Sequence, residues 1–380
     1  MCDVDEVDIV VGLAWGDEGK GKVVSDMLRL SNQSYDYVCR FNGGPNAGHT
    51  IYKEGKKYKT HLVPAGIFHN IPSYIGPGCV VNIKKLKEEF TYLESNGFNT
   101  DLVKVHPNAH IITDEHIAYD KEHLGHLGTT GQGIAPAYAD KMLRKGIRAK
   151  DQLPSDMLWP GDLSGNILAE GAQSIWLDPD LGDYPYVTSS STLPYYACSL
   201  GFSTEKINNI IGVAKAYDTK SGIDPLFPSS LFDDPILSKI GELGAEFGTT
   251  TGRRRAVNYL NVTKLVKAIQ LSGASSLVIN KIDILDQVAN LGIGDPYNVI
   301  YGSTQINTAT FKPGISLRNN FIQWIREALY DDADMEDHQI TFSSHPEFVI
   351  TPNECECGAK LTSTRCNICN MEIDWTFIKE

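Results

Sequence analysis

The sequence predicts an α/β fold, in which short buried strands alternate with amphipathic helices. At the start of the chain, the β-branched residues 7–11 are followed by a glycine-rich stretch, 12–22, and then by helical spacing over 23–28. Strand, glycine loop and helix in this order begin a βα unit. Further short apolar runs bounded by turns are typical of buried strands in such a sheet. They lie at residues 37–41, 74–81, 210–214 and 276–279.

Two segments between these runs have the spacing of amphipathic helices. Residues 83–95 place apolar side chains on one face, with Asn82 positioned to cap the start and Gly97 just past the end. A second helix is expected over residues 318–330. The inward side chains expected for the two helices are Ile83, Leu86, Phe90 and Leu93, and Phe321, Trp324, Ile325 and Leu329.

Composition excludes several classes of protein. The 380 residues are 42% hydrophobic, which is enough for a sizeable core and argues against disorder. A net charge of −13 argues against a protein that coats nucleic acid. No apolar run approaches the ~18 residues of a membrane span, and the first residues are acidic where a signal peptide would be basic. We therefore expect a cytoplasmic protein that binds neither nucleic acid nor membrane.

The last part of the chain differs in composition. Four of the eight cysteines crowd into the end of the sequence, so we expect a main domain over residues 1–352 and a small tail over 353–380. Two close thiolate pairs suit a structural, tetrahedral Zn²⁺ in a zinc-ribbon-like tail, with disulfides as the alternative. The expected zinc ligands are Cys355, Cys357, Cys366 and Cys369.

The first glycine-rich loop is a candidate phosphate site, because backbone N–H groups and a helix N-terminus attract anions. It is not a Walker A loop: six residues separate Gly12 from Gly19, and Gly21 stands where a Ser or Thr would hold Mg²⁺. Asp17 is the carboxylate available to a metal, and Lys20 is the charge available to a β- or γ-phosphate. The alternative is a glycine-rich turn with a chance lysine.

Two further polar, glycine-rich stretches are candidates for binding phosphate. Residues 41–50 end in His49, which could donate to a phosphate oxygen or protonate it, although a lone loop histidine is often structural. Residues 126–133 combine adjacent threonines with glycines and could form a second anion-binding nest.

Two later stretches point to a nucleotide and to a small anion. Three consecutive arginines at 253–255 follow a threonine–glycine turn and could bind a dicarboxylate or phosphate, or form a solvated basic surface. Asn280-Lys-Ile-Asp283, at the end of an expected strand, matches the N-K-x-D sequence with which GTP-binding proteins read guanine.

Six motifs, four of them within the stretches above, resemble in this order the adenylosuccinate synthetase family over roughly residues 7–350. The resemblance implies a large, mainly parallel sheet flanked by helices, similar to that of P-loop NTPases, and a homodimer. It also implies a ligase that joins L-aspartate to C6 of a 6-oxopurine nucleotide, normally IMP, with GTP and Mg²⁺. The motifs are residues 15–22, 46–50, 128–133, 170–173, 184–188 and 250–255.

The resemblance also implies a role for each matching residue. Asp17 would remove the N1 proton and ligate Mg²⁺ together with the Gly48 carbonyl, while His49 and Lys20 would stabilise the phosphoryl group. The acceptor nucleotide would contact Asn46, Thr130, Gln173, Thr188, Arg253 and, from the partner subunit, Arg144. The aspartate would contact Thr251, Arg253 and Arg255. The donor nucleotide would contact Gly16, Glu18, Gly19, Lys20, Gly21, Lys22, Thr50, Lys281, Asp283, Ser344 and Pro346.

Departures from the family pattern cluster at the substrates. A short connection after Arg144 is similar to the compact archaeal and viral branch. Ile223 stands near the ribose site, Ala14 and Ser174 replace the usual Gln and Gly, and His345 is added in the turn over the donor base.

These changes favour a viral type of enzyme, acting in the host cytoplasm, that uses dGMP, aspartate and ATP or GTP to make N6-succino-2-amino-2′-deoxyadenylate. The retained Asp17 favours the alternative, an ordinary synthetase that uses IMP and GTP. Two more distant alternatives are a regulatory GTPase and a non-catalytic nucleotide-binding protein.

Overall fold

The computed structural model describes residues 3–31, 34–227, 234–248, 252–289, 297–301, 307–311 and 317–349. The expected boundary at 352/353 and the four cysteines of the tail lie outside these residues. Among the helices that are described, none combines the length and the apolar character needed to cross a membrane.

The centre of the molecule is an eight-stranded sheet in the order β16-β13-β10-β1-β9-β2-β5-β7. Every pair of neighbours in this sheet is parallel, which agrees with the mainly parallel sheet that the resemblance implies. The strands are β1 (Asp3–Gly12), β2 (Tyr37–Arg40), β5 (Ser73–Ile75), β7 (Val103–Val105), β9 (Ser164–Glu170), β10 (Ile207–Lys215), β13 (Ser276–Asn280) and β16 (Ile340–Ser343).

Helices cover both faces of this sheet, and alternate residues of its strands enter two different hydrophobic clusters. In β1, Ile9 and Val11 belong to one cluster and Val10 to the other. In β9, Ala169 and Leu168 divide in the same way. Successive side chains of a strand point to opposite faces, so a strand that is buried on both faces reads as a continuous apolar run. This explains why short apolar runs in the sequence predict the central strands.

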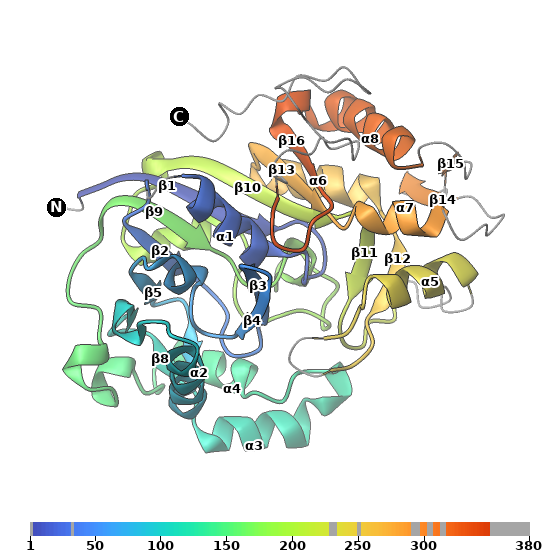
Figure 1. Ribbon diagram of the computed structural model, residues 1–380. Coiled ribbons are helices and arrows are strands. Elements are labelled where there is room, and N and C mark those ends of the chain that lie inside the picture. The colour runs from blue at the N-terminus through green and yellow to red at the C-terminus, as the bar shows by residue number, and fades with distance from the viewer. Residues whose placement is uncertain are drawn as a thin grey trace.

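The helices form two groups beside the sheet (Figure 1). One group, α2, α3 and α4, lies toward the β5–β7 edge, and the other, α6, α7 and α8, lies toward β13 and β16, while α1 follows β1 directly. The bounds are α1 (Lys20–Leu30), α2 (Ile83–Ser95), α3 (Asp114–His123), α4 (Ile134–Met142), α5 (Pro235–Leu243), α6 (Val262–Ser272), α7 (Asp283–Ala289) and α8 (Leu317–Ala333).

Both helices predicted in detail are present. The side chain of Asn82 accepts a hydrogen bond from the backbone N–H of Lys85, as expected of an N-cap, and Gly97 follows the end of α2 with φ of 86°. Helix α8 buries Phe321, Ile325 and Leu329 completely.

Two local predictions differ from the structure. The apolar run at 74–81 is not one strand but two, β5 and β6 (Val80–Val81), because the segment Gly76–Cys79 makes a turn in which the Cys79 N–H donates to the Gly76 carbonyl. The first helix begins at Lys20 instead of near Val23, so the lysines of the glycine-rich loop are already helical.

The remaining strands form two-stranded ribbons outside the main sheet. The pair β3–β4 is an antiparallel hairpin that carries His49 on its first residue, and β11–β12 lies beside the arginine loop. The bounds are β3 (His49–Lys53), β4 (Lys56–Thr60), β8 (His110–Ile111), β11 (Tyr217–Lys220), β12 (Ala256–Tyr259), β14 (Tyr297–Tyr301) and β15 (Asn307–Phe311), with β6 pairing β8 and β14 pairing β15.

Candidate active site

The candidate site residues gather at one edge of the sheet because their loops follow the carboxyl ends of parallel strands. Ligands of open α/β sheets bind at this edge. The segments are 13–19 after β1, 41–48 after β2, 171–174 after β9, 281–282 after β13 and 344–346 after β16, together with 221–225 after the β10–β11 segment.

The first loop turns sharply around the buried carboxylate of Glu18. Gly16, Asp17 and Gly19 have φ angles of 94°, 61° and 97°, a left-handed conformation that favours glycine. Glu18 accepts from the Gly16 N–H (2.7 Å) and from Lys20 Nζ (2.8 Å). Burial would raise the pKa of Glu18, but the charge and hydrogen bond of Lys20 outweigh burial and lower it. The carboxylate therefore fixes the loop in a conformation that leads directly into the N-terminus of α1.

His49 lies against the start of α1. A Cβ added to Gly21 would lie 3.2 Å from the Cβ of His49, so helix and hairpin touch at this point. His49 Nδ1 contacts the buried carboxylate of Glu170, which also accepts from the Ala65 N–H (3.0 Å). Burial would raise the pKa of Glu170, yet its contact with His49, the charge of Arg40 and the Ala65 hydrogen bond hold it at about 2. Burial also lowers the pKa of His49, which favours the neutral imidazole. With Nδ1 engaged, Nε2 has no hydrogen-bond partner among the described residues and is the ring nitrogen left for a ligand.

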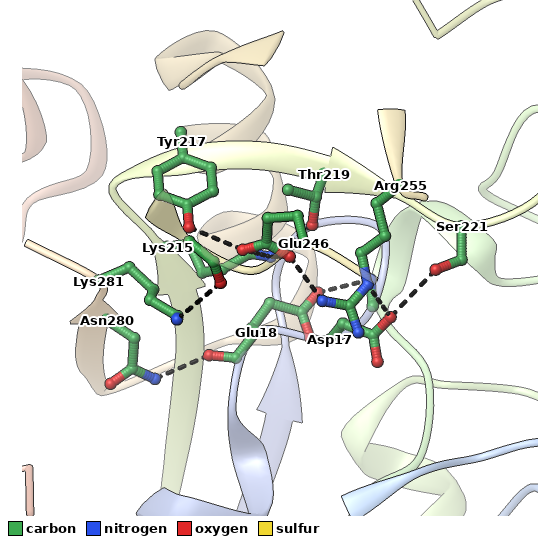
Figure 2. A network of polar contacts seen from close by, with 12 residues as sticks. Asp17, Glu18, Lys215, Tyr217, Thr219, Ser221, Glu246, Arg255, Asn280 and Lys281 are labelled. Carbon is green, nitrogen blue, oxygen red and sulfur yellow. Dashed lines mark hydrogen bonds and ion pairs between the residues drawn. The ribbon is translucent and has the colours of Figure 1, made fainter. Parts of the chain in front are cut away.

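Asp17 is held by an ionic network that extends into the interior at Glu246 (Figure 2). Its Oδ2 lies 2.8 Å from Arg255 Nε and accepts from Ser221 Oγ at 3.2 Å. Arg255 Nη1 donates to Glu246 (2.5 Å), and the same carboxylate accepts from Tyr217 Oη (2.7 Å). The network thus connects the phosphate loop to the arginine loop across about 240 residues of sequence.

The motifs expected at the acceptor nucleotide are joined by side-chain to backbone contacts. Asn42 exchanges two hydrogen bonds with the backbone of Ala172, at 3.1 and 2.7 Å, which joins the loops after β2 and β9. Gln173 has φ of 58°, and its Oε1 lies 2.9 Å from the place of a Cβ on Gly43. Ser174 Oγ accepts from the Ala14 N–H at 2.8 Å. Two of the departures from the family pattern, Ala14 and Ser174, are therefore direct partners.

The 128–133 loop is held by Asp120, which accepts from Thr129 Oγ1 (2.8 Å) and from the Gly133 N–H (2.7 Å). A Cβ on Gly128 would lie 2.6 Å from the backbone N of Ile223. Ile223, which is half exposed, therefore packs beside the loop that carries Thr130.

The two motifs expected at the donor base, 63 residues apart in sequence (Asn280 to Ser343), lie side by side at the ends of β13 and β16. Lys22 Nζ donates to Ser343 Oγ (2.7 Å) and to the His345 carbonyl (3.1 Å), and burial lowers the pKa of Lys22 to about 7. Lys281 has φ of 67° and donates to the Gly244 carbonyl at 3.1 Å. Burial raises the pKa of Asp283, which begins α7.

The added side chain of His345 closes its own turn. Its Nδ1 accepts from the N–H groups of Glu347 (3.1 Å) and Phe348 (3.3 Å), and its ring stacks on Phe348. The imidazole is therefore part of the turn that carries Ser344 and Pro346.

The other expected site residues are placed as follows. Asn46 and Gly48 lie in the loop before β3, and Thr50 lies on β3 opposite Lys59. The Thr188 N–H donates to the Leu177 carbonyl at 2.7 Å. Arg253 is exposed, and Thr251 lies outside the described residues.

Arg144 lines a cavity of its own. It follows α4 with φ of 61° and lines a cavity of about 560 Å³ together with other basic residues, among them Lys141 and Arg148. No residue of the phosphate loop or arginine loop lines this cavity.

Several residues of the site were missing from the sequence-based set. Asn280 lies in the segment 280–283 and Glu170 in the segment 170–173, but the sequence assigned neither residue a role. In the structure, Asn280 Nδ2 donates to the Glu18 carbonyl at 2.7 Å. Lys215 and Glu246 had no sequence signal, because an isolated Lys or Glu is ordinarily a surface residue.

The described residues contain no cluster of three or more His, Cys, Asp or Glu side chains that could hold a metal. A single carboxylate nevertheless fits Mg²⁺, which is commonly bound by one or two carboxylates plus substrate phosphates. Asp17 is one-quarter exposed, and its Oδ1 has no partner among the described residues, so it provides such an oxygen.

The fold and the site together define a nucleotide-binding α/β protein, with a glycine-rich anion loop after the first strand of a parallel sheet. Comparison with known proteins gives the family. The family model "Adenylosuccinate synthetase" matches residues 9–160 and 161–315. The chain belongs to the adenylosuccinate synthetase family and is accordingly an enzyme, a ligase that forms a carbon–nitrogen bond.

Relatives and solved structures agree with this family. Adenylosuccinate synthetases of Desulforapulum autotrophicum and Lysinibacillus sphaericus are 38% and 37% identical, each over 76% of this chain and 80% of the relative. The structure of a fully ligated adenylosuccinate synthetase from Plasmodium falciparum is 27% identical with a TM-score of 0.74, over 90% of this chain and 98% of that chain.

A second solved structure is similar in fold. It is a cyanophage S-2L succinoaminodeoxyadenylate synthetase bound to dGMP and to dATP as an energy donor. It is 20% identical with a TM-score of 0.67, over 93% of this chain and 97% of that chain, and at this identity the likeness concerns the fold.

Proposed function

We propose that this chain joins L-aspartate to C6 of a purine nucleoside monophosphate at the expense of a nucleoside triphosphate. The observation that carries the proposal is the grouping of Asp17, Lys20 and His49 on or against one anion loop at the carboxyl edge of the sheet. A carboxylate, an ammonium group and an imidazole are the groups that such a reaction requires.

The reaction proceeds in two steps. Asp17 takes the N1 proton of the purine, so that O6 attacks the γ-phosphorus; the O6–P bond forms, the bond to the β-phosphate oxygen breaks, and the nucleoside diphosphate leaves. Lys20 and His49 Nε2 stabilise the charge of the phosphoryl group during transfer. The aspartate amine then attacks C6 and loses a proton, and inorganic phosphate leaves from C6.

Asp17 and the Gly48 carbonyl are the groups we propose for Mg²⁺. When bound, Mg²⁺ would neutralise charge on the transferring phosphates. The ion pair between Asp17 and Arg255 occupies one carboxylate oxygen in this structure, and Oδ1 remains for the metal.

The substrate contacts that we propose follow the family. Asn46, Thr130, Gln173, Thr188 and Arg253 would contact the acceptor nucleotide, and Thr251, Arg253 and Arg255 the aspartate. The donor would lie along residues 16–22, with Thr50 nearby and its base beside Lys281, Asp283, Ser344 and Pro346. Arg144 would serve the acceptor phosphate of the partner subunit in a homodimer; in its own chain it lines a cavity without residues of the phosphate loop or arginine loop.

For the acceptor we favour dGMP, with N6-succino-2-amino-2′-deoxyadenylate as the product. The supporting observation is Ile223, which packs beside Gly128 where the family pattern has a smaller residue and where a ribose would lie. A bulky apolar side chain at this place disfavours a 2′-hydroxyl. His345, in the turn over the donor base, favours a donor site that accepts ATP as well as GTP.

The alternative acceptor is IMP, with GTP as donor. It is supported by the retained Asp17 and by the relatives, which are adenylosuccinate synthetases at 36–38% identity. A spectrophotometric assay with aspartate, Mg²⁺ and either IMP or dGMP decides between the two. Turnover of IMP with none of dGMP rejects the dGMP proposal, and turnover of neither rejects the ligase reaction on purine monophosphates.

For the cysteine tail we propose a structural Zn²⁺ on Cys355, Cys357, Cys366 and Cys369. We expect about one zinc per chain in protein purified without chelator, as four thiolate ligands imply. Metal analysis that finds no zinc in such protein rejects the site.

A further inference from the structure

The hairpin that carries the arginines is closed at its base by two kinds of contact. The backbone N–H of Arg255 donates to the Glu246 carbonyl (3.0 Å), and the Gly248 N–H donates to the Arg253 carbonyl (2.8 Å). The side chains of the first pair meet again, because Arg255 Nη1 donates to Glu246 Oε2 at 2.5 Å. Residues 246 and 255 therefore fix both the path of the hairpin and the direction of one guanidinium group.

Glu246 is an unusual residue for this place, since its side chain is only 1% exposed. A buried carboxylate is costly unless its oxygens are fully paired. Here it accepts from Tyr217 Oη (2.7 Å) and Lys215 Nζ (3.3 Å) as well as from Arg255. Burial would raise the pKa of Glu246, but Lys215 and Arg255 hold it at about 2.

The contacts of Arg255 Nη1 and Nε determine which way Nη2 points. Nη1 is held by Glu246 and Nε lies 2.8 Å from Asp17, so the plane of the guanidinium is fixed from both sides (Figure 2). Nη2 has no partner among the described residues. A guanidinium whose plane is fixed in this way holds the N–H groups of Nη2 in fixed directions, from which they can donate to an incoming carboxylate.

The same turn also touches the donor-base segment. Lys281 Nζ donates to the Gly244 carbonyl at 3.1 Å, and a Cβ on Gly244 would lie 2.3 Å from Tyr217 Oη. The chain from Gly244 to Glu246 is therefore packed tightly between the donor-base motif and the Lys215–Tyr217 pair. A movement of Glu246 would be transmitted to Arg255 and not absorbed by loose packing.

We propose that Glu246 is a positioning residue that aims Arg255 Nη2 at a carboxylate of the aspartate substrate. This inference rests on the proposed ligase reaction and adds a residue to it. Glu246 touches no substrate and acts through Arg255, and Lys215 and Tyr217 serve to keep its buried charge paired.

The test compares Glu246→Gln, which keeps the size and removes the charge, with Glu242→Gln. Glu242 lies on α5, four residues before Glu246, is exposed and pairs with Lys239 on the surface, so its variant should behave as wild type. We expect Glu246→Gln to raise the aspartate KM roughly tenfold or more, the usual effect of losing a hydrogen bond to a charged group. The KM values for both nucleotides should stay within about twofold. A conservative Glu246→Asp variant should recover part of the aspartate affinity.

Glu246→Gln leaves Lys215 buried without its counter-charge and could fail to fold for that reason. The double variant Lys215→Met/Glu246→Gln removes both charges, and we expect it to melt near the wild-type temperature and to retain the raised aspartate KM. Recovery of the wild-type aspartate KM in the double variant would overturn the inference. The inference would also be overturned if Glu246→Gln changed the KM values for aspartate and for both nucleotides equally, or changed none of them. If wild-type enzyme consumes aspartate with neither IMP nor dGMP, the proposed function fails and this inference fails with it.

Discussion

At the residue scale, two buried carboxylates organise the site. Glu170 contacts His49 and Glu246 contacts Arg255, and the pKa of each acid is held at about 2 by its basic partners against the effect of burial. A base paired in this way has one nitrogen committed and another nitrogen directed elsewhere. The side chains that we place at the chemistry are therefore oriented by residues that do not take part in it.

Replacing Asp17 by Asn, or His49 by Asn, should abolish most of the activity. Losing a positioned general acid or base typically lowers the rate 10²–10⁴-fold, so we expect kcat to fall roughly that far with the protein still folded. The measurement is steady-state turnover with circular dichroism as a check of folding. His123→Asn, at an exposed histidine on α3, is the matched control and should retain full activity. Full activity in the Asp17 and His49 variants would refute their roles.

Asp218 on β11 should make stability depend on pH. Burial raises the pKa of its carboxyl from 3.8 to about 7, although the Asn261 N–H donates to it. Between about pH 4 and 7 the folded chain therefore holds a proton that the unfolded chain has released. The contribution of Asp218 to the free energy of unfolding falls as pH rises through this window, by up to about 4 kcal/mol.

Thermal melts of Asp218→Asn at pH 5 and pH 8 test this expectation. The variant keeps an acceptor for the Asn261 N–H and removes the ionisable group, so it should gain stability relative to wild type at pH 8 more than at pH 5. Asp101→Asn, at an exposed carboxyl, serves as control. An identical pH dependence in wild type and Asp218→Asn would contradict the assignment.

At the scale of elements, the turn from β1 into α1 depends on glycines in a left-handed conformation. Gly19 has φ of 97°, and a Cβ there would lie 2.9 Å from Asn280 Nδ2. Gly97, after α2, has a similar φ of 86° with no atom within 4 Å of the same position. The two glycines thus differ in the space around them and not in backbone strain.

A comparison of Gly19→Ala with Gly97→Ala distinguishes the cost of the left-handed backbone from the cost of the contact with Asn280. Each should cost about 1 kcal/mol of stability through the left-handed backbone alone. Gly19→Ala should in addition displace Asn280 from the Glu18 carbonyl, raise the donor KM and lower kcat. Equal kinetics for the two variants would show that the contact with Asn280 is unimportant for the loop.

At the scale of the whole molecule, the parallel sheet brings together loops that are far apart in sequence, whereas Arg144 lines a cavity that contains no residue of the phosphate loop or arginine loop. If Arg144 serves the partner's site, each site of the dimer contains groups from two chains. Mixing two inactive variants, Arg144→Leu and Asp17→Asn, should then restore activity. Random reassortment of a symmetric dimer gives about a quarter of the wild-type value. Analytical ultracentrifugation measures the dimer directly, and no recovery on mixing would indicate that each chain works alone.

The sequence by itself determined the fold class, most of the central strands, helices α2 and α8, and the phosphate, histidine, arginine and donor-base motifs. Buried parallel strands and capped amphipathic helices have local patterns, and loops at strand ends keep their chemistry in adjacent residues. The turn at Gly76–Cys79, which divides one expected strand in two, carries a Gly-Pro-Gly signal that the expectation of a single strand passed over.

Only the tertiary structure decided which partners these motifs have. The burial of Glu246, the pairing of Ser174 with Ala14, and the bond from Asn280 to the Glu18 carbonyl each join segments that lie apart in the chain. A side chain's environment depends on what packs against it, and neither its residue type nor its spacing along the chain contains that information.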